Sequence, residues 1–177
     1  MAHRQLTGVL LVGGRSARFG SPKALARLGG ETLAERAWRV LGEACGERLA
    51  VGKAADGLPL PFPLLDDDSP VRAPIAGLVA GLRAARNEVI VALPVDCPLV
   101  TPEAVRALGE ALAVSHTGPL PGAYSLAMLP ELEARLAAET YGLRGVNPRV
   151  LELDERLLAD VDTPADLAAL EARARVV

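Results

Sequence analysis

The fold is decided by the stretch Leu10-Leu11-Val12-Gly13-Gly14-Arg15-Ser16-Ala17-Arg18-Phe19-Gly20-Ser21-Pro22-Lys23. It continues an apolar run that starts at Leu6 and has the length and composition of a short buried strand. The two glycines that follow permit positive φ and a close approach of the backbone, so that successive N–H groups can point at one anion. Three basic residues then lie within a few positions on an acidic protein: Arg15, Arg18 and Lys23. We therefore predict a loop that binds a di- or triphosphate, the simpler alternative being a glycine turn with a solvated basic edge.

Strand and helix patterns alternate along the chain downstream of this loop. A capping box at Thr32 and Glu35 begins a helical apolar pattern that ends at Gly46. Further strands are predicted at Leu49–Val51, Pro63–Leu65, Val89–Leu93 and Ala123–Met128, and further helices over Ala73–Leu82, after Thr101, and over Leu129–Ala138. Such alternation predicts an α/β fold with a mostly parallel sheet and right-handed crossovers.

Length and composition limit the classes of protein that the chain can belong to. A chain of 177 residues is expected to form a single domain over 1–177. Its 19 basic and 22 acidic residues are interspersed and give a net charge of −3, which argues against nucleic acid as a partner. No apolar run approaches the roughly 18 residues that span a bilayer, so we expect no membrane segment and a cytoplasmic protein. Cys45 and Cys97 are far apart and are expected to be buried thiols in a reducing compartment.

A second candidate for chemistry is Asp96, in the sequence Pro94-Val95-Asp96-Cys97-Pro98. It follows the apolar strand at Val89–Leu93, and Thr101 with Pro102 begins a helix soon afterwards. An aspartate just past the carboxyl end of a central parallel strand lies where such sheets bind ligands. Its carboxylate is suited to Mg²⁺, and the alternative is a turn aspartate.

Three further segments contain weaker candidates. Asp66 is the first of three consecutive aspartates, and the alternative explanation for this run is a solvated turn. Gly77 and Gly81 share one face of the predicted helix, so that either a neighbouring element or a flat purine approaches the backbone there. Arg144 is a candidate for a bidentate phosphate or pterin contact. Near the carboxyl end, helix capping accounts for Thr163, Pro164 and Asp166, which leaves Asp160 and Asp162 available for function.

The glycine-rich loop resembles the signature loop of the molybdenum cofactor guanylyltransferases, with Val12 and Phe19 in place of the usual alanine and methionine. Three later segments follow in that family's order: Ala73-Pro74-Ile75-Ala76-Gly77, Pro94-Val95-Asp96-Cys97-Pro98, and Asp162-Thr163-Pro164. The resemblance implies a three-layer α/β/α Rossmann-like nucleotidyltransferase fold. One departure is Gly52, which stands where the family has an asparagine in the nucleotide pocket.

The resemblance also implies roles for individual residues. Catalysis would rest on Lys23, Arg18 and Asp96, with Mg²⁺ as cofactor held by Asp96 and by Asp162 as a second ligand. The nucleotide would be bound by Leu11, Val12, Gly13, Gly14, Lys23, Asp66, Gly77 and Asp96. Asp66 would accept hydrogen bonds either from N1–H and the 2-amino group of guanine or from a ribose hydroxyl.

The implied reaction is the transfer of GMP from GTP to the terminal phosphate of molybdopterin, with release of pyrophosphate. A phosphate monoester is already ionised at pH 7, so no general base is needed and catalysis consists of positioning and charge neutralisation. GTP and molybdopterin are the implied partners, and proteins that deliver or accept the cofactor stay open. The alternatives are a relative that uses CTP or another phosphorylated acceptor, and a non-catalytic nucleotide-binding domain, against which the presence of both Lys23 and Asp96 argues.

Overall fold

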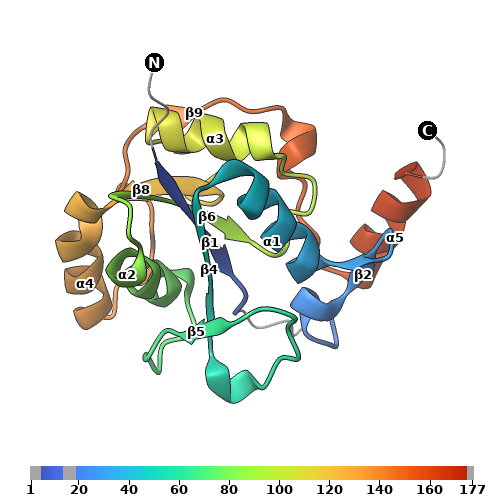
Figure 1. Cartoon of the computed structure of the whole chain (residues 1–177), viewed down its shortest axis with the longest axis horizontal. Helices are drawn as coiled ribbons and strands as arrows, with labels where there is room; N and C mark the ends of the chain where they lie inside the picture. Colours follow the sequence, from blue (N-terminus) through green and yellow to red (C-terminus); the bar gives the residue numbers. More distant parts are fainter. Residues whose placement is uncertain (1–4, 14–18, 175–177) are drawn as a thin grey trace.

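The structure is a computed structural model that describes residues 5–13 and 19–174. Its centre is a seven-stranded sheet in the order β5-β4-β1-β6-β8-β7-β9 (Figure 1). The strands are β1 (Leu6–Leu11), β4 (Glu47–Gly52), β5 (Leu64–Asp66), β6 (Val89–Pro94), β7 (Val114–Ser115), β8 (Gly122–Ser125) and β9 (Val150–Leu151). A separate two-stranded sheet pairs β2 (Arg27–Leu28) with β3 (Glu31–Thr32).

Strand β1 lies in the interior of the large sheet and pairs in parallel with β4 on one side and β6 on the other. All six of its residues are buried, as expected for a strand covered on both faces. Leu6 and Leu10 belong to the core on one face, whereas Val9 and Leu11 belong to the core on the other. The predicted parallel arrangement is confirmed for β5, β4, β1 and β6, while β8 pairs with β6 in the antiparallel direction.

Helices cover both faces of the sheet. Helices α1 (Leu33–Ala44) and α3 (Pro102–Ala111) pack on one face, and α2 (Pro74–Ala84) and α4 (Leu129–Ala137) pack on the other (Figure 1). The result is the predicted three-layer α/β/α fold. In the part of the chain that the structure describes, no helix has the length and apolar character needed to cross a membrane.

Helix α1 begins as its sequence predicts. The Thr32 hydroxyl accepts the Glu35 N–H at 3.1 Å, and the Glu35 carboxylate accepts the Thr32 N–H at 2.8 Å. These reciprocal bonds satisfy two N–H groups that have no partner within the helix, and they fix its first residue.

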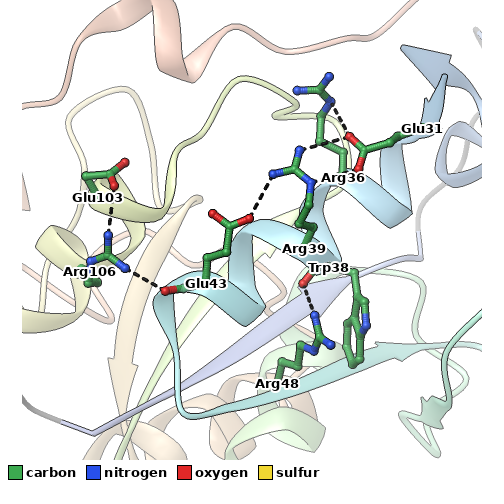
Figure 2. A network of polar contacts seen from close by, with 8 residues as sticks. All are labelled: Glu31, Arg36, Trp38, Arg39, Glu43, Arg48, Glu103 and Arg106. Atoms are coloured by element: carbon green, nitrogen blue, oxygen red, sulfur yellow. Dashed lines mark hydrogen bonds and ion pairs between the residues drawn. The ribbon is translucent and has the colours of Figure 1, made fainter. Parts of the chain in front are cut away.

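The outer face of α1 is held to its neighbours by a network of polar contacts (Figure 2). Arg39 donates to Glu31 at 2.9 Å and to Glu43 at 3.2 Å. Arg106 of α3 donates to the Glu43 carbonyl, and Arg48 of β4 donates to the Trp38 carbonyl while its guanidinium lies 4.3 Å from the centre of the Trp38 ring. The network joins α1 to α3 and β4, on which its apolar face packs.

The glycine stripe of α2 is explained by the neighbouring strand. A Cβ on Gly77 would lie 2.7 Å from Cδ2 of Leu11, and a Cβ on Gly81 would lie 3.0 Å from both methyl groups of Val9. Glycine therefore lets α2 approach β1 closely. Of the two explanations that the sequence left open for the stripe, the neighbouring element is confirmed.

The carboxyl-terminal third differs from the sequence prediction at Ala123–Met128, and it contains two short strands that were not predicted, β7 and β9. The segment Ala123–Met128 was expected to be a single strand, but β8 ends at Ser125 and a 3₁₀ turn, η3 (Leu126–Met128), leads directly into α4. Pairing with β6 sets this limit, because the described register ends with Val89 opposite Ser125.

Helix α5 (Pro164–Ala174) lies beside the β2–β3 hairpin, apart from the two main helical layers (Figure 1). Leu28 of the hairpin and Val161, just before the helix, are buried in a small core with Phe19 and Leu33. The Val161 N–H also donates to the Asp96 carbonyl at 2.8 Å. This arrangement brings the segment before α5 to the end of β6.

Candidate active site

A cavity of about 480 Å³ lies at the edge of the sheet where β1, β4 and β6 end. Its walls come from the carboxyl ends of these strands and from the loops that follow them, in the segments 11–13, 51–53 and 94–97. The segment that leads into α2, residues 71–74, closes another side. Parallel sheets bind ligands at this edge, so the cavity is the candidate active site.

Lys23 joins the glycine-rich loop to two acidic residues from distant parts of the chain. It begins the short 3₁₀ turn η1 (Lys23–Leu25) and its side chain is 15% exposed. Its ammonium lies 3.5 Å from Oδ2 of Asp96 and 2.7 Å from Oδ1 of Asp162. Three residues that the sequence analysis selected thus lie together, although the chain separates the first from the last by 139 positions.

The electrostatics of this cluster favour an added cation. Burial raises the pKa of Asp96, the Lys23 ammonium opposes that rise, and the neighbouring carboxylates of Asp160 and Asp162 reinforce it. The pKa of the adjacent Cys97 thiol is raised mainly by burial, so this group stays protonated, with Sγ 3.8 Å from Oδ1 of Asp96. Among the described residues, these three carboxylates and one ammonium leave an excess of negative charge near Asp96 that a divalent cation would offset.

The residues present fit Mg²⁺ as a shared ligand of protein and substrate. Among the residues that the structure describes, no group of three or more His, Cys, Asp or Glu side chains forms a metal site on its own. Mg²⁺ commonly takes one or two carboxylates and completes its shell with water and substrate phosphates. Asp96 and Asp162, both in contact with Lys23, could supply those carboxylates.

Asp66, which the sequence analysis selected, does not line the cavity. Its carboxylate accepts the N–H groups of Ala54 at 2.7 Å and Asp68 at 2.8 Å, and these bonds lower its pKa. The next residue, Asp67, lines the cavity instead. The physical reason is that β5 ends at Asp66, whose carboxylate is used to cap the turn η2 (Ala54–Asp56) and the start of its own loop.

The remaining predicted residues divide into three groups. Leu11, Val12, Gly13 and Gly77 line the cavity, as does Asp96. Gly14 and Arg18 lie outside the described residues. Arg144 is exposed and does not line the cavity; its carbonyl accepts a hydrogen bond from Arg135 at 3.0 Å.

Sequence reasoning missed Lys53, Asp67 and Arg72, which also line the cavity. Lys53 follows the last residue of β4 directly, so its position after a predicted parallel strand could have marked it. Nothing in the sequence distinguishes Asp67 from the aspartates on either side.

The profile of the MobA-like NTP transferase domain matches residues 8–151 of this chain. The chain belongs to that family. A probable molybdenum cofactor guanylyltransferase from Chloroflexus aggregans is 32% identical, and the alignment covers 96% of this chain and 95% of that protein. The family assignment makes the chain a nucleotidyltransferase.

Two solved structures show the same architecture. The molybdopterin-guanine dinucleotide biosynthesis protein A of Archaeoglobus fulgidus superimposes with a TM-score of 0.80 at 23% identity, over 97% of this chain and all of that one. A Mycobacterium tuberculosis protein crystallised in complex with manganese gives a TM-score of 0.64 at 25% identity, over 95% of this chain and 98% of that one. Both superpositions show that this chain has the same overall fold as these two proteins.

Proposed function

We propose that this protein transfers GMP from GTP to the terminal phosphate of molybdopterin, releasing pyrophosphate and forming a guanine dinucleotide cofactor. The observation that carries the proposal is that Lys23 and Asp96 both line the cavity and lie 3.5 Å apart, while Asp162 contacts the same ammonium. The naming of full-length relatives as molybdenum cofactor guanylyltransferases supports the choice of GTP and of the acceptor.

Each of the site residues has a separate proposed role in the transfer. Lys23 would neutralise the triphosphate and follow the charge onto the leaving pyrophosphate, because its ammonium is held at the cavity by two acids. Gly13 would bring backbone N–H groups against the phosphates. Asp96 and Asp162 would hold Mg²⁺, and this ion supplies neutralisation of the phosphate oxygens when it is bound.

The covalent change requires no proton transfer to the protein. An oxygen of the acceptor phosphate forms a bond to the α-phosphorus of GTP, the bond between that phosphorus and the bridging oxygen breaks, and the electron pair leaves with pyrophosphate. The acceptor oxygen is already ionised at pH 7, so the site needs charge and alignment but no base. This requirement agrees with a cluster built from one ammonium and several carboxylates.

The proposed function is tested by measuring pyrophosphate release with molybdopterin, Mg²⁺ and each of GTP, CTP, ATP and UTP in turn. We expect release with GTP, and loss of it when Asp96 is replaced by Asn, because a ligand of the metal is removed. Glu133→Gln is a suitable control, since that exposed carboxylate pairs with Arg83 on the α2–α4 side of the sheet. Release with CTP alone, or full activity of Asp96→Asn, would contradict the proposal.

A further inference from the structure

The cavity has a second charged pair, which the phosphate chemistry does not use. Lys53 follows β4, and Asp67 follows β5. The strand order β5-β4-β1-β6 places this pair on the opposite side of β1 from Asp96, which follows β6. If the triphosphate lies against Lys23 and Asp96, as the proposed function requires, the nucleoside extends toward Lys53 and Asp67.

The contacts of this pair are specific and largely shielded from solvent. The Lys53 ammonium lies 2.6 Å from Oδ1 of Asp67 and also donates to the Ser69 carbonyl. The side chains of Lys53 and Asp67 are only 12% and 6% exposed. Because a buried charge is costly without a partner, each of the two groups depends on the other.

These bonds leave one oxygen of Asp67 available. Oδ1 accepts from Lys53 and, at 3.0 Å, from the Ser69 N–H. Among the described residues, no donor contacts Oδ2. The Asp67 N–H donates to the Gly52 carbonyl at 3.0 Å, which fixes the backbone beneath the carboxylate. Asp67, which lines the cavity, thus keeps one carboxylate oxygen that accepts no hydrogen bond from a described residue.

The other charged groups of this region are engaged elsewhere. Asp66 accepts from Ala54 and Asp68, and Arg72 pairs with Asp56 through contacts of 2.7 and 3.1 Å. Lys53 is therefore the cation that directly balances Asp67.

We propose that Lys53 is a positioning residue for recognition of the nucleoside: by binding Oδ1 of Asp67 it presents Oδ2 to a donor group of the bound nucleotide. Suitable donors are the amino and ring N–H groups of a purine, or a ribose hydroxyl. Lys53 makes no contact with phosphate in this arrangement, because its ammonium is committed to Asp67 and Ser69. The inference rests on the proposed function and adds a determinant of selectivity to it.

The test compares Lys53→Met with the wild-type protein by calorimetric titration in the presence of Mg²⁺. The ligands are GTP, inosine triphosphate, which lacks the 2-amino group, 2′-deoxy-GTP, which lacks one ribose hydroxyl, and pyrophosphate. Methionine keeps most of the apolar stem and removes the charge. Arg83→Met is the matched control, because Arg83 forms an exposed ion pair with Glu133.

In the wild-type protein, we expect one of the two analogues to bind more weakly than GTP, and which one it is identifies the donor. In Lys53→Met, GTP affinity should fall about 10-fold or more, the scale of a lost hydrogen bond to a charged group, and the preference for GTP over that analogue should disappear. Pyrophosphate should bind both proteins equally well.

The double variant Lys53→Met/Asp67→Asn separates recognition from folding, because it leaves no unpaired buried charge. We expect it to recover the thermal stability lost in Lys53→Met without recovering the preference for GTP. If both Lys53 variants keep the wild-type preference, or if pyrophosphate affinity falls as much as GTP affinity, the inference is overturned. A wild-type protein that binds no nucleotide would instead overturn the proposed function.

Discussion

At the scale of single residues, the defining feature is the lysine that two acids hold at the mouth of the glycine-rich loop. An ammonium is a compact charge on a flexible stem, so two carboxylates are needed to fix it. Asp96 and Asp162 do this from two separate segments of the chain. Under the proposed function, the Lys23 ammonium would therefore be oriented before substrate binds.

Replacing Lys23 with Ala should lower turnover by about 10²-fold or more, because a charge contact to the transition state is lost. Pyrophosphate release at saturating GTP measures this effect. Arg83→Met, which removes a cation from the α2–α4 side of the sheet, should leave turnover unchanged. Near-normal turnover of Lys23→Ala would refute the role proposed for its ammonium.

Lys23 and Asp96 could be predicted from the sequence because each follows an apolar strand within a distinctive motif. Asp67 could not. The sequence offers three consecutive aspartates, and only the end of β5 decides which of them faces the cavity. Lys53 was missed for a related reason, since its partner lies on a loop 14 residues later.

At the scale of elements, the close approach of α2 to β1 determines where the cavity wall lies. Gly77 and Gly81 face Leu11 and Val9, and Gly77 also lines the cavity. The packing of this helix therefore affects both the stability of the fold and the width of the site.

Gly81→Ala should destabilise the protein by about 1 kcal/mol. Overpacking a core costs about 1–3 kcal/mol, and the better helix propensity of alanine returns up to about 1 kcal/mol. Val9 has little freedom to yield, because both of its methyl groups lie 3.0 Å from the new Cβ and its side chain is β-branched. Urea unfolding measures the change.

Gly46→Ala is the control for this substitution, since among the described residues, its two chain neighbours aside, no atom lies within 4 Å of its added Cβ. It should change the free energy of unfolding by less than about 0.5 kcal/mol. Equal effects of the two alanines would argue against close packing as the cause.

The start of α5 positions Asp162 through a single carboxylate. Asp166 accepts from the N–H groups of Asp162 and Thr163 at 3.0 and 2.7 Å, and from the Thr163 hydroxyl at 2.8 Å. These bonds lower the pKa of Asp166 below its ordinary value of 3.8. The hydrogen bond from the Thr163 hydroxyl has the largest effect, and the two backbone hydrogen bonds come next. The predicted cap of α5 at Thr163 is confirmed, because its hydroxyl accepts the Asp166 N–H. Asp166, the third residue of the helix, also binds the Asp162 N–H.

Since the pKa of Asp166 is lower in the folded than in the unfolded protein, its contribution to stability is present above pH 3.8 and is lost as the pH falls through the folded value. The Asp166→Asn protein should therefore have a lower free energy of unfolding than the wild type at pH 6. Below pH 3.8 the difference in unfolding free energy between the two proteins should become smaller. Urea unfolding at both pH values measures this. A constant difference between the two proteins would show that the carboxylate charge does not contribute.

The alternation of strands and helices predicted β1, β4, β5 and β6 and helices α1, α2 and α3 in their order, because these strands contain apolar runs and these helices have recognisable starts. The β2–β3 hairpin was not predicted, since its strands are two residues long and largely polar. The last part was harder to predict. Strands β7 and β9 are two residues long and depend on pairing partners that lie far along the chain.

At the scale of the whole molecule, the cavity is lined by seven separate stretches of the chain, which lie between Leu11 and Asp160. A ligand bound there contacts segments that unfolding would separate. Ligand binding should therefore raise the stability of the entire fold.

GTP with Mg²⁺ at 100 times its dissociation constant should stabilise the folded state by about 2.7 kcal/mol. For a protein of this size, that corresponds to a rise in Tm of ~5–10 °C. Thermal unfolding followed by circular dichroism measures the shift. The Asp96→Asn protein should show a smaller rise with GTP and Mg²⁺, and an equal rise would mean that metal binding does not depend on Asp96.

Asp162 lies beyond residue 151, where the match to the family profile ends, yet its carboxylate is 2.7 Å from Lys23. The domain profile therefore ends before the last residue of this charge cluster. A shortened form that ends at residue 151 would retain every described strand of the large sheet and still lack one of the two carboxylates that contact Lys23. Gene fusions and minimal versions of this enzyme should accordingly retain the tail through α5.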